Sequence, residues 1–444
     1  PPCACTPWVA WATIARQEPD APETRGVPIP RFHIHTLGCK VNMAESEAIA
    51  AALLALGWTR ATDAADCDVA ILNTCTVTGE ADAKNRKALR TLLRAGKAAI
   101  IVMGCAVNID AARYADVDPR IICEHDKERI PALAVRLARD TAAVSTAISD
   151  QTTMERSDSG FRTRVDLKIQ DGCDNACSYC IVHVARGPAR SVPAATVISR
   201  ARTLADAGTR ELVLVGIDLA AYRDADIDLA RLVTLLQEKT DIGRVRVSSV
   251  EPQSVTPTLV DVLAHSEGRL CRHLHLCLQS GSDKVLREMN RRYDADAFCT
   301  LANRLHEAVP RIALSTDVIV GFPGETEDDF ARTCKLVERC GFMRLHVFRY
   351  SKRPGTPAAS RDDQVDPKVK AARSQTLIEL GRRLTLSDME RRLGTIEEVV
   401  IERPGIGTSE SYHAVACDTV LPVGALVEVE FNDIDTDTMR LIGR

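Results

Sequence analysis

The chain contains 444 residues, more than one ordinary domain of about 100–200 residues, which predicts two or three domains. With 45% hydrophobic residues, 27% charged residues and a net charge of −4, it is not a polybasic protein that binds nucleic acid through overall charge. No apolar run approaches the roughly 18 residues that span a bilayer, so we expect a cytoplasmic protein with no membrane partner.

The first part of the chain changes character at residue 31. Residues 1–30 contain seven prolines and show no helical or strand period, which predicts a disordered extension. A βα alternation follows, with strands expected at 31–37, 68–73, 98–103 and 120–123 and helices at 43–54 and 80–94. This alternation predicts an open parallel α/β domain over residues 31–150, closed by a polar linker at 149–160.

A second and longer βα series follows the linker. Strands are expected at 165–169, 211–215, 244–248, 273–278, 314–320 and 344–348, which predicts a partial (β/α)6 barrel over residues 160–390 with its site at the carboxyl ends of the strands. Short strands at 397–401, 412–416 and 426–431 then predict a small all-β barrel over residues 394–444. The predicted fold class is therefore α/β with a terminal β-barrel.

Three of the 16 cysteines follow the first strand of the longer series. Cys173, Cys177 and Cys180 lie within eight residues on one loop. A [4Fe–4S] cluster normally takes four thiolates, so three would leave one iron open for a substrate or cofactor. The alternatives are a zinc site completed by His183 and a buried trio without a ligand.

Three further cysteines are dispersed. Cys39, Cys75 and Cys105 each come just after the carboxyl end of one of the first three predicted strands. In an open parallel sheet those ends border one crevice, so we expect the three thiols to meet and to hold a second cluster with an open iron. The alternative is three unrelated, half-buried thiols.

The C-x3-C-x2-C spacing, with Tyr179 before the last cysteine, resembles the signature of radical S-adenosylmethionine enzymes. The resemblance implies that the open iron chelates the amino and carboxylate groups of S-adenosylmethionine. An electron from a low-potential donor, such as flavodoxin or ferredoxin, then yields methionine and a 5′-deoxyadenosyl radical. The protein orients this chemistry and excludes competing reactions.

Further sequence motifs extend the resemblance to the methylthiotransferases, over residues 31–444. They include the stretches 276–282, 320–326 and 348–356, and the end of the chain resembles the TRAM domain, a small RNA-binding barrel. The stretch 36–42, Thr-Leu-Gly-Cys-Lys-Val-Asn, is similar to the MtaB branch. The resemblance implies two [4Fe–4S] clusters, S-adenosylmethionine, and methylthiolation at C2 of N6-threonylcarbamoyladenosine beside the tRNA anticodon.

Cofactor contacts beyond the cysteines are weaker predictions, and no further catalytic residue is identified. Gly321 and Gly324 bend the chain after a strand, either to approach the cofactor or as a plain turn. Gln279 and Ser280 end another strand and could bind ribose or carboxylate, as Tyr179 could contact the cofactor site. Residues 325–329 are expected to begin a helix.

Charge bears on the expected tRNA partner. Residues 349–392 carry eleven Lys and Arg against six Asp and Glu, whereas the terminal barrel from residue 395 carries three Arg against ten acids. Phosphate contacts are therefore expected mainly from residues 349–392, which we call the basic connector. The terminal barrel would then recognise the shape of the RNA loop or contact a protein instead. Lys40 either pairs with the threonyl carboxylate of the substrate or points to solvent.

Three other functions remain open from the sequence. The same chemistry could act on isopentenyladenosine in tRNA or on an aspartate of a ribosomal protein. A non-catalytic alternative is a metal- or cluster-bearing module that binds RNA.

Overall fold

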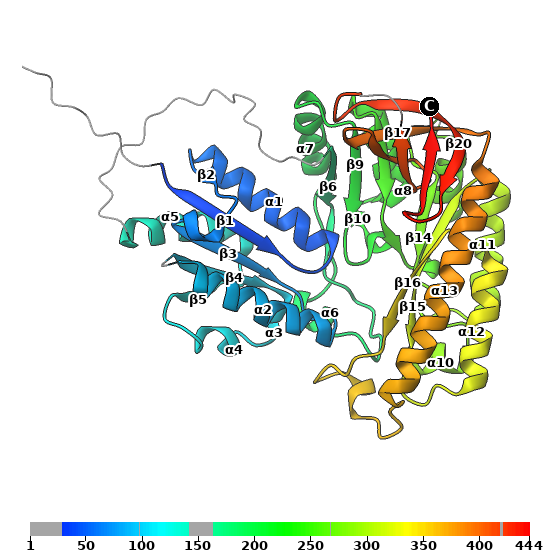
Figure 1. Ribbon diagram of the computed structural model, residues 1–444, viewed down its shortest axis with the longest axis horizontal. Helices are drawn as coiled ribbons and strands as arrows, with labels where there is room; N and C mark the ends of the chain where they lie inside the picture. The colour runs from blue at the N-terminus through cyan, green and yellow to red at the C-terminus, as the bar shows by residue number, and fades with distance from the viewer. Residues whose placement is uncertain (1–28, 97, 142–162, 267, 418–420) are drawn as a thin grey trace, which may run out of the picture.

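A computed structural model describes residues 29–96, 98–141, 163–266, 268–417 and 421–444. Three regions follow one another along the chain: an α/β domain, a larger α/β barrel and a terminal β-barrel, coloured blue to cyan, green to orange and orange-red to red in Figure 1. Apart from residues 29 and 30, the predicted extension lies outside the described residues, as does the whole of the predicted linker.

The first region is built on a parallel sheet in the order β2-β1-β3-β4-β5. Its strands are β1 (Arg31–Thr36), β2 (Thr59–Arg60), β3 (Val69–Thr74), β4 (Ala99–Gly104) and β5 (Ile121–Cys123). Strands β3 and β4 are buried along their whole length, as strands covered on both faces are. The four predicted strands are confirmed, and the two-residue edge strand β2 is an addition.

Helices cover both faces of this sheet (Figure 1). They are α1 (Lys40–Ala55), α2 (Gly79–Ala95), α3 (Cys105–Ile109), α4 (Ala112–Ala115) and α5 (Ile130–Thr141). Helix α1 has two apolar faces, because Ile49 and Leu53 pack on its own sheet whereas Val41 and Ala44 pack on Val213 and other residues of the second region. Helix α1 is thus shared between two regions.

The second region is a curved set of parallel strands. They are β6 (Arg164–Lys168), β9 (Glu211–Val215), β12 (Arg244–Val247), β13 (Ser249–Val250), β14 (His273–Leu276), β15 (Ala313–Val320) and β16 (Arg344–Arg349). They form the sheets β12-β9-β6 and β13-β14-β15-β16, and a parallel bridge between Val245 and Leu270 joins the β12 strand to the segment before β14. The six predicted strands are confirmed, with one divided into β12 and β13.

The helices of the second region are α6 (Val182–Arg186), α7 (Ala194–Asp206), α8 (Leu229–Lys239), α9 (Pro257–Ala264), α10 (Asp283–Glu288), α11 (Ala295–Ala308), α12 (Glu327–Cys340) and α13 (Pro367–Arg392). The main apolar core lies between the strands and six of these helices, α7, α8, α9, α11, α12 and α13. Helix α6 packs on α3 of the first region instead, and Val285 of α10 belongs to a separate apolar cluster. Helix α12 begins with a capping box between Thr326 and Asp329, which confirms the predicted helix start.

The strands alternate between this outer core and an inner face. Leu274 and Leu276 of β14 belong to the core, whereas His273 and His275 point the other way and contact Ser315 of β15. On β16, Leu345 and Val347 pack on the core, and Arg344, His346 and Phe348 alternate with them. The inner face is therefore polar, as expected for a surface that receives ligands.

The terminal region is a closed barrel in the order β17-β18-β19-β21-β20. Its strands are β17 (Ile396–Arg403), β18 (Ile406–Ser409), β19 (Ala414–Cys417), β20 (Leu426–Asp435) and β21 (Arg440–Gly443). The predicted all-β barrel is confirmed, although the four-residue strands β18 and β21 were not predicted. None of the helices in the described ranges has the length and apolarity to cross a membrane.

Two buried arginines of the second region attach this barrel through hydrogen bonds to its backbone. Arg246 Nε donates to Glu211 Oε1 at 2.7 Å, and Arg244 Nη2 lies 2.6 Å from Glu211 Oε2. The same arginines donate to backbone carbonyl oxygens of Thr408 and Ser409 in the terminal barrel. All three charged side chains are fully buried, and the two arginines share the single carboxylate of Glu211.

Candidate functional site

The dispersed cysteines lie at one edge of the first sheet. Cys39 precedes α1, Cys75 follows β3 directly, and Cys105 opens α3 after β4. Gly38 has φ +104°, and a Cβ there would lie 2.7 Å from Cβ of Cys75, so the loop carrying Cys39 packs against Cys75. Burial, with smaller contributions from the nearby Cys105 and Cys39, raises the pKa of Cys75 to about 11. The topology therefore brings the three thiols together, as the sequence predicts.

A buried arginine contacts this triad. Arg186 Nε donates to Sγ of Cys105 at 3.2 Å, and its Nη1 donates to Glu45 Oε1 at 2.9 Å and to Asp171 Oδ1 at 2.8 Å. Burial raises the pKa of Cys105, and the charge of Arg186 opposes that shift. Arg186 therefore favours the thiolate form, which is the form that binds metal.

The second triad lies on the loop after β6. Burial raises the pKa of Cys180 to about 12, and the nearby Cys177 and Cys173 contribute to this rise. Backbone amides reach two of them, because Asn175 N donates to Sγ of Cys173 and Val182 N to Sγ of Cys180, both at 3.4 Å. The loop conformation depends on Gly172, where a Cβ would overlap the Pro188 carbonyl.

This triad also has a buried arginine. Arg291 Nη1 donates to Sγ of Cys177 at 3.2 Å, and its Nη2 forms an ion pair with Glu251. Beside it, the Tyr293 hydroxyl donates to the carbonyl of Leu278 at 2.8 Å. Sequence reasoning missed both Arg186 and Arg291, because their contacts with sulfur arise from tertiary packing and no local spacing marks them.

The spacing of the sulfur atoms bears on the metal. Across the described parts of the chain, only His275, Cys277 and Asp317 place three ligand atoms within 4.8 Å of one another. Neither cysteine triad is that compact, and His183 does not join Cys173, Cys177 and Cys180 in such a group. A cubane holds its thiolates further apart than a single ion does, and the iron–sulfur clusters at the two triads stay predictions.

The remaining predicted cofactor residues have mixed surroundings. Tyr179 packs against an apolar cluster that includes Phe322 and Tyr350. Gln279, at φ +67°, is fixed by backbone hydrogen bonds to Asp317 and Ile319. Ser280 is fully buried, and its hydroxyl contacts Thr333 of α12 and accepts from the Ser282 amide. The Ser280 hydroxyl thus has structural partners, and cofactor contacts at all three residues stay predictions.

Packing explains the two predicted glycines. Gly321 has φ +70°, and a Cβ there would lie 2.3 Å from Cγ of Lys370. Gly324 has φ +73°, and a Cβ would lie 2.5 Å from Oδ2 of Asp363. Both positions need glycine to let the segment after β16 approach, so the plain-turn alternative has direct support and the cofactor contact stays a prediction.

A charged network joins the surroundings of the two triads. Glu45 of α1 accepts hydrogen bonds from Lys168 Nζ at 2.6 Å and Lys127 Nζ at 2.7 Å, in addition to Arg186. Burial alone would raise the pKa of Glu45, but Arg186, Lys127 and Lys168 lower it to about 2. Lys168 and Arg186 belong to the second region, so Glu45 fixes the first region against the strand that leads to Cys173.

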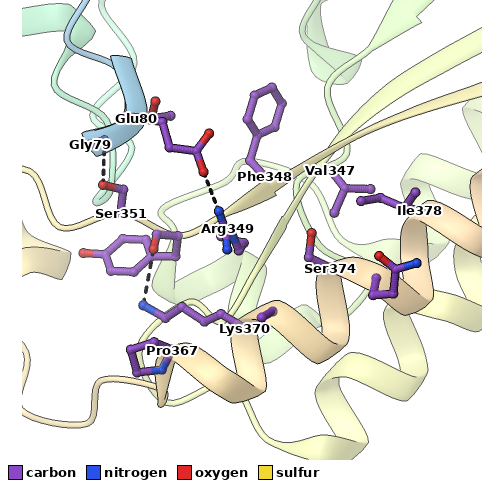
Figure 2. A pocket seen from close by; sticks show the side chains of 14 residues that line it. Gly79, Glu80, Val347, Phe348, Arg349, Ser351, Pro367, Lys370, Ser374 and Ile378 are labelled. Carbon is purple, nitrogen blue, oxygen red and sulfur yellow. Dashed lines mark hydrogen bonds and ion pairs between the residues drawn. The ribbon is translucent and has the colours of Figure 1, made fainter. Parts of the chain in front are cut away.

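A cavity of about 750 Å³ lies where α2, β16 and α13 meet. Figure 2 shows Arg349 paired with Glu80 on one side and Lys370 reaching the Tyr350 carbonyl on the other. Phe348 and Ile378 line it and are 40% and 51% exposed. Basic side chains beside exposed apolar ones are typical of surfaces that bind single-stranded nucleic acid.

The two cysteine sites coincide with two matched families. Residues 167–337 match the Radical SAM superfamily, and residues 31–123 match the Uncharacterized protein family UPF0004.

Relatives match most of the chain. The threonylcarbamoyladenosine tRNA methylthiotransferase MtaB of Bacillus subtilis is 37% identical over 85% of this chain and 86% of its own. The protein of the same name from Chlamydia pneumoniae is 33% identical over 91% and 96%. The tRNA-2-methylthio-N(6)-dimethylallyladenosine synthase of Sorangium cellulosum is 35% identical over 84% and 82%.

The fold also matches a solved structure. The radical S-adenosylmethionine methyltransferase TsrM of Kitasatospora setae, with cobalamin and a [4Fe-4S] cluster bound, aligns over 74% of this chain and 77% of its own with a TM-score of 0.54. At 14% sequence identity, this likeness shows the fold alone.

Proposed function

The chain belongs to the radical S-adenosylmethionine tRNA methylthiotransferases, and we propose that within this family it modifies N6-threonylcarbamoyladenosine. It is an enzyme that transfers a sulfur-containing group to tRNA, and its family uses a [4Fe–4S] cluster with S-adenosylmethionine. The finer substrate rests on the names of the Bacillus and Chlamydia relatives, together with the sequence Lys40-Val41-Asn42 after the first cysteine.

We further propose that the chain holds two clusters. Cys173, Cys177 and Cys180 would bind the cluster that, with S-adenosylmethionine, supplies a radical able to remove hydrogen from C2 of the adenine. Cys39, Cys75 and Cys105 would bind the second. The separate placement of two thiol triads, each with one arginine donating to a cysteine sulfur, is the observation that carries this proposal.

The protein's own residues then have distinct tasks. Arg186 and Arg291 hold one sulfur of each triad and stabilise its thiolate. Glu45 keeps the two regions at a fixed separation, so that C2 of the adenine and the sulfur to be transferred would meet in a constant geometry. The cavity beside β16 and the basic connector would bind the anticodon loop, whose unpaired bases can be splayed out without opening a duplex. We propose that a flavodoxin or ferredoxin supplies the electron and that the enzyme acts in the cytoplasm with its tRNA.

The test is nucleoside mass spectrometry of total tRNA. A strain lacking the gene should lose 2-methylthio-N6-threonylcarbamoyladenosine and accumulate the form without the methylthio group. The wild-type gene should restore it, and the Cys173→Ala gene should not. The dimethylallyladenosine synthases among the relatives favour a second candidate substrate, so loss of the methylthio form of that nucleoside instead would contradict the proposal.

A further inference from the structure

Basic side chains surround Tyr412 of the terminal barrel at the base of the inner face. Nζ of Lys40 lies 4.9 Å from the centre of the Tyr412 ring, and Cζ of Arg164 and of Arg344 lie 5.4 Å and 5.5 Å from it. They come from α1, β6 and β16, so three elements converge on one point. We call Lys40, Arg164 and Arg344 the basic floor. Lys40 therefore packs on Tyr412 and does not project freely into solvent.

The basic floor has too few negative partners. Arg164 forms an ion pair with Glu402, but its Nη1 is buried and has no hydrogen-bond partner among the described residues. Neither Lys40 nor Arg344 forms an ion pair with a carboxylate anywhere in the described ranges, and Arg344 reaches only the carbonyl oxygen of Tyr412 at 3.5 Å. By contrast, Arg246, which also faces Tyr412, forms a buried ion pair with Glu211, a carboxylate that it shares with Arg244.

This imbalance favours a bound anion. Burial lowers the pKa of Arg344, and the positive charge of Arg164 lowers it further. Cations held together away from bulk water repel one another, and an anion between them removes that repulsion. Carboxylates and phosphates suit such a site, because arginine and lysine bind both through charge-assisted hydrogen bonds.

The inner face of β16 runs from the floor towards the carboxyl ends of the strands. Arg344, His346 and Phe348 lie along this face, and His346 and Phe348 are exposed to solvent. Arg164 and Arg344 begin their strands, whereas Cys173 follows the carboxyl end of β6. Because β6 has five residues, the basic floor lies roughly 13 Å from that end of the strand. The floor and Cys173 therefore lie at opposite ends of β6.

We propose that the basic floor binds the carboxylate carried by the N6 substituent of the target adenosine. The proposal rests on the function proposed above and names the residues that recognise its substrate. In adenosine, C2 and N6 share the Watson–Crick edge, which lies away from the sugar. A base that enters with its sugar at the mouth therefore leads with this edge, so a group on N6 can go deeper. The RNA phosphates stay outside with the sugar, which favours the carboxylate as the anion.

The experiment measures binding of fluorescent anticodon stem-loops that differ only at the target base. The base is N6-threonylcarbamoyladenosine, its methyl ester, N6-isopentenyladenosine or adenosine, and the reconstituted enzyme is kept without S-adenosylmethionine. Lys40→Met and Arg344→Met should each weaken binding of the carboxylate stem-loop by about 10-fold or more and leave the other three unchanged. Lys40→Arg, which keeps the charge, should retain affinity.

Arg304→Met is the matched control, because Arg304 is an exposed cation on α11, and it should bind all four stem-loops as the wild type does. Thermal unfolding midpoints identify a variant that has lost its fold, in which case Lys40→Gln replaces Lys40→Met. Equal weakening of all four stem-loops would assign the floor to RNA phosphates and overturn the proposal, as would no weakening. If the wild type itself binds the isopentenyl stem-loop more tightly, the proposed function fails. If the wild type binds the carboxylate stem-loop most tightly but the variants bind it equally well, only the role of the basic floor is rejected.

Discussion

The two cysteine triads reach similar environments by different routes. Cys173, Cys177 and Cys180 share one loop, so local chain geometry alone places them together. Cys39, Cys75 and Cys105 come from three βα junctions and meet only because their strands are parallel neighbours. Each triad nevertheless has one arginine donating to a sulfur at 3.2 Å. The comparison teaches that the dispersed site depends on the whole domain, whereas the local site depends mainly on its loop.

The largest expected effect separates the chemistry of the two sites. Reconstituted wild type should hold about eight iron atoms per chain, and replacing Cys173, Cys177 and Cys180 together with Ala should leave about half. This variant should form no 5′-deoxyadenosine, whereas Cys75→Ala should still form it and give no methylthio product. Iron analysis and chromatography of the products measure both. Normal product from Cys75→Ala would remove the dispersed site from the reaction.

Removing Arg186 should have the next largest effect. Arg186→Met leaves Glu45 and Asp171 buried with less compensation, which should cost about 3–5 kcal/mol of unfolding free energy. Urea unfolding of the apoprotein measures this, and iron analysis should show loss mainly from the dispersed site. Arg190→Met is the control, because Arg190 also pairs with Asp171 but is 59% exposed. An equal effect of both substitutions would show that burial of the arginine does not matter.

The same network predicts a pH dependence. The folded-state pKa of Glu45 is lowered from 4.5 to about 2, so its contribution is complete above pH 4.5 and is lost as the pH falls towards 2. This contribution amounts to at most about 3 kcal/mol. Unfolding free energies of the wild-type apoprotein should therefore fall more steeply below pH 4.5 than those of Glu45→Gln. Parallel curves would show that Glu45 does not carry the dependence.

The smallest predicted effect tests how tightly the Cys39 loop packs. Gly38→Ala places a Cβ 2.7 Å from that of Cys75 at a positive φ, whereas Gly57→Ala imposes a similar φ, +81°, with no atom within 4 Å. Both should lose about 1–2 kcal/mol through backbone strain, and Gly38→Ala should lose more. Only Gly38→Ala should also lower the iron content of the dispersed site. This content is measured in a chain in which Cys173, Cys177 and Cys180 are replaced with Ala, so that the other cluster does not contribute. Equal iron content in both would disprove the close packing.

The period of the hydrophobic residues predicted the fold, and the close spacing of Cys173, Cys177 and Cys180 along the chain predicted the local triad. The positions of Cys39, Cys75 and Cys105 were predictable because parallel strand ends share an edge. Strands β18 and β21 were missed because each has only four residues and one of them is glycine, which is depleted in strands. Arg186 and Arg291 were missed because their partners are remote in sequence, and the contact of Lys40 with Tyr412 spans the first and last regions of the chain.

Helix α1 has a consequence for how such enzymes can be recombined. One side of α1 completes the core of its own domain, while Val41, Ala44 and Glu45 complete the wall of the neighbouring barrel. The two regions are consecutive along the chain, yet they are not interchangeable modules. A chimera that exchanges the first region with that of a relative must also match Lys168 and Arg186 to the incoming helix. Substitutions on these facing surfaces should therefore be inherited together.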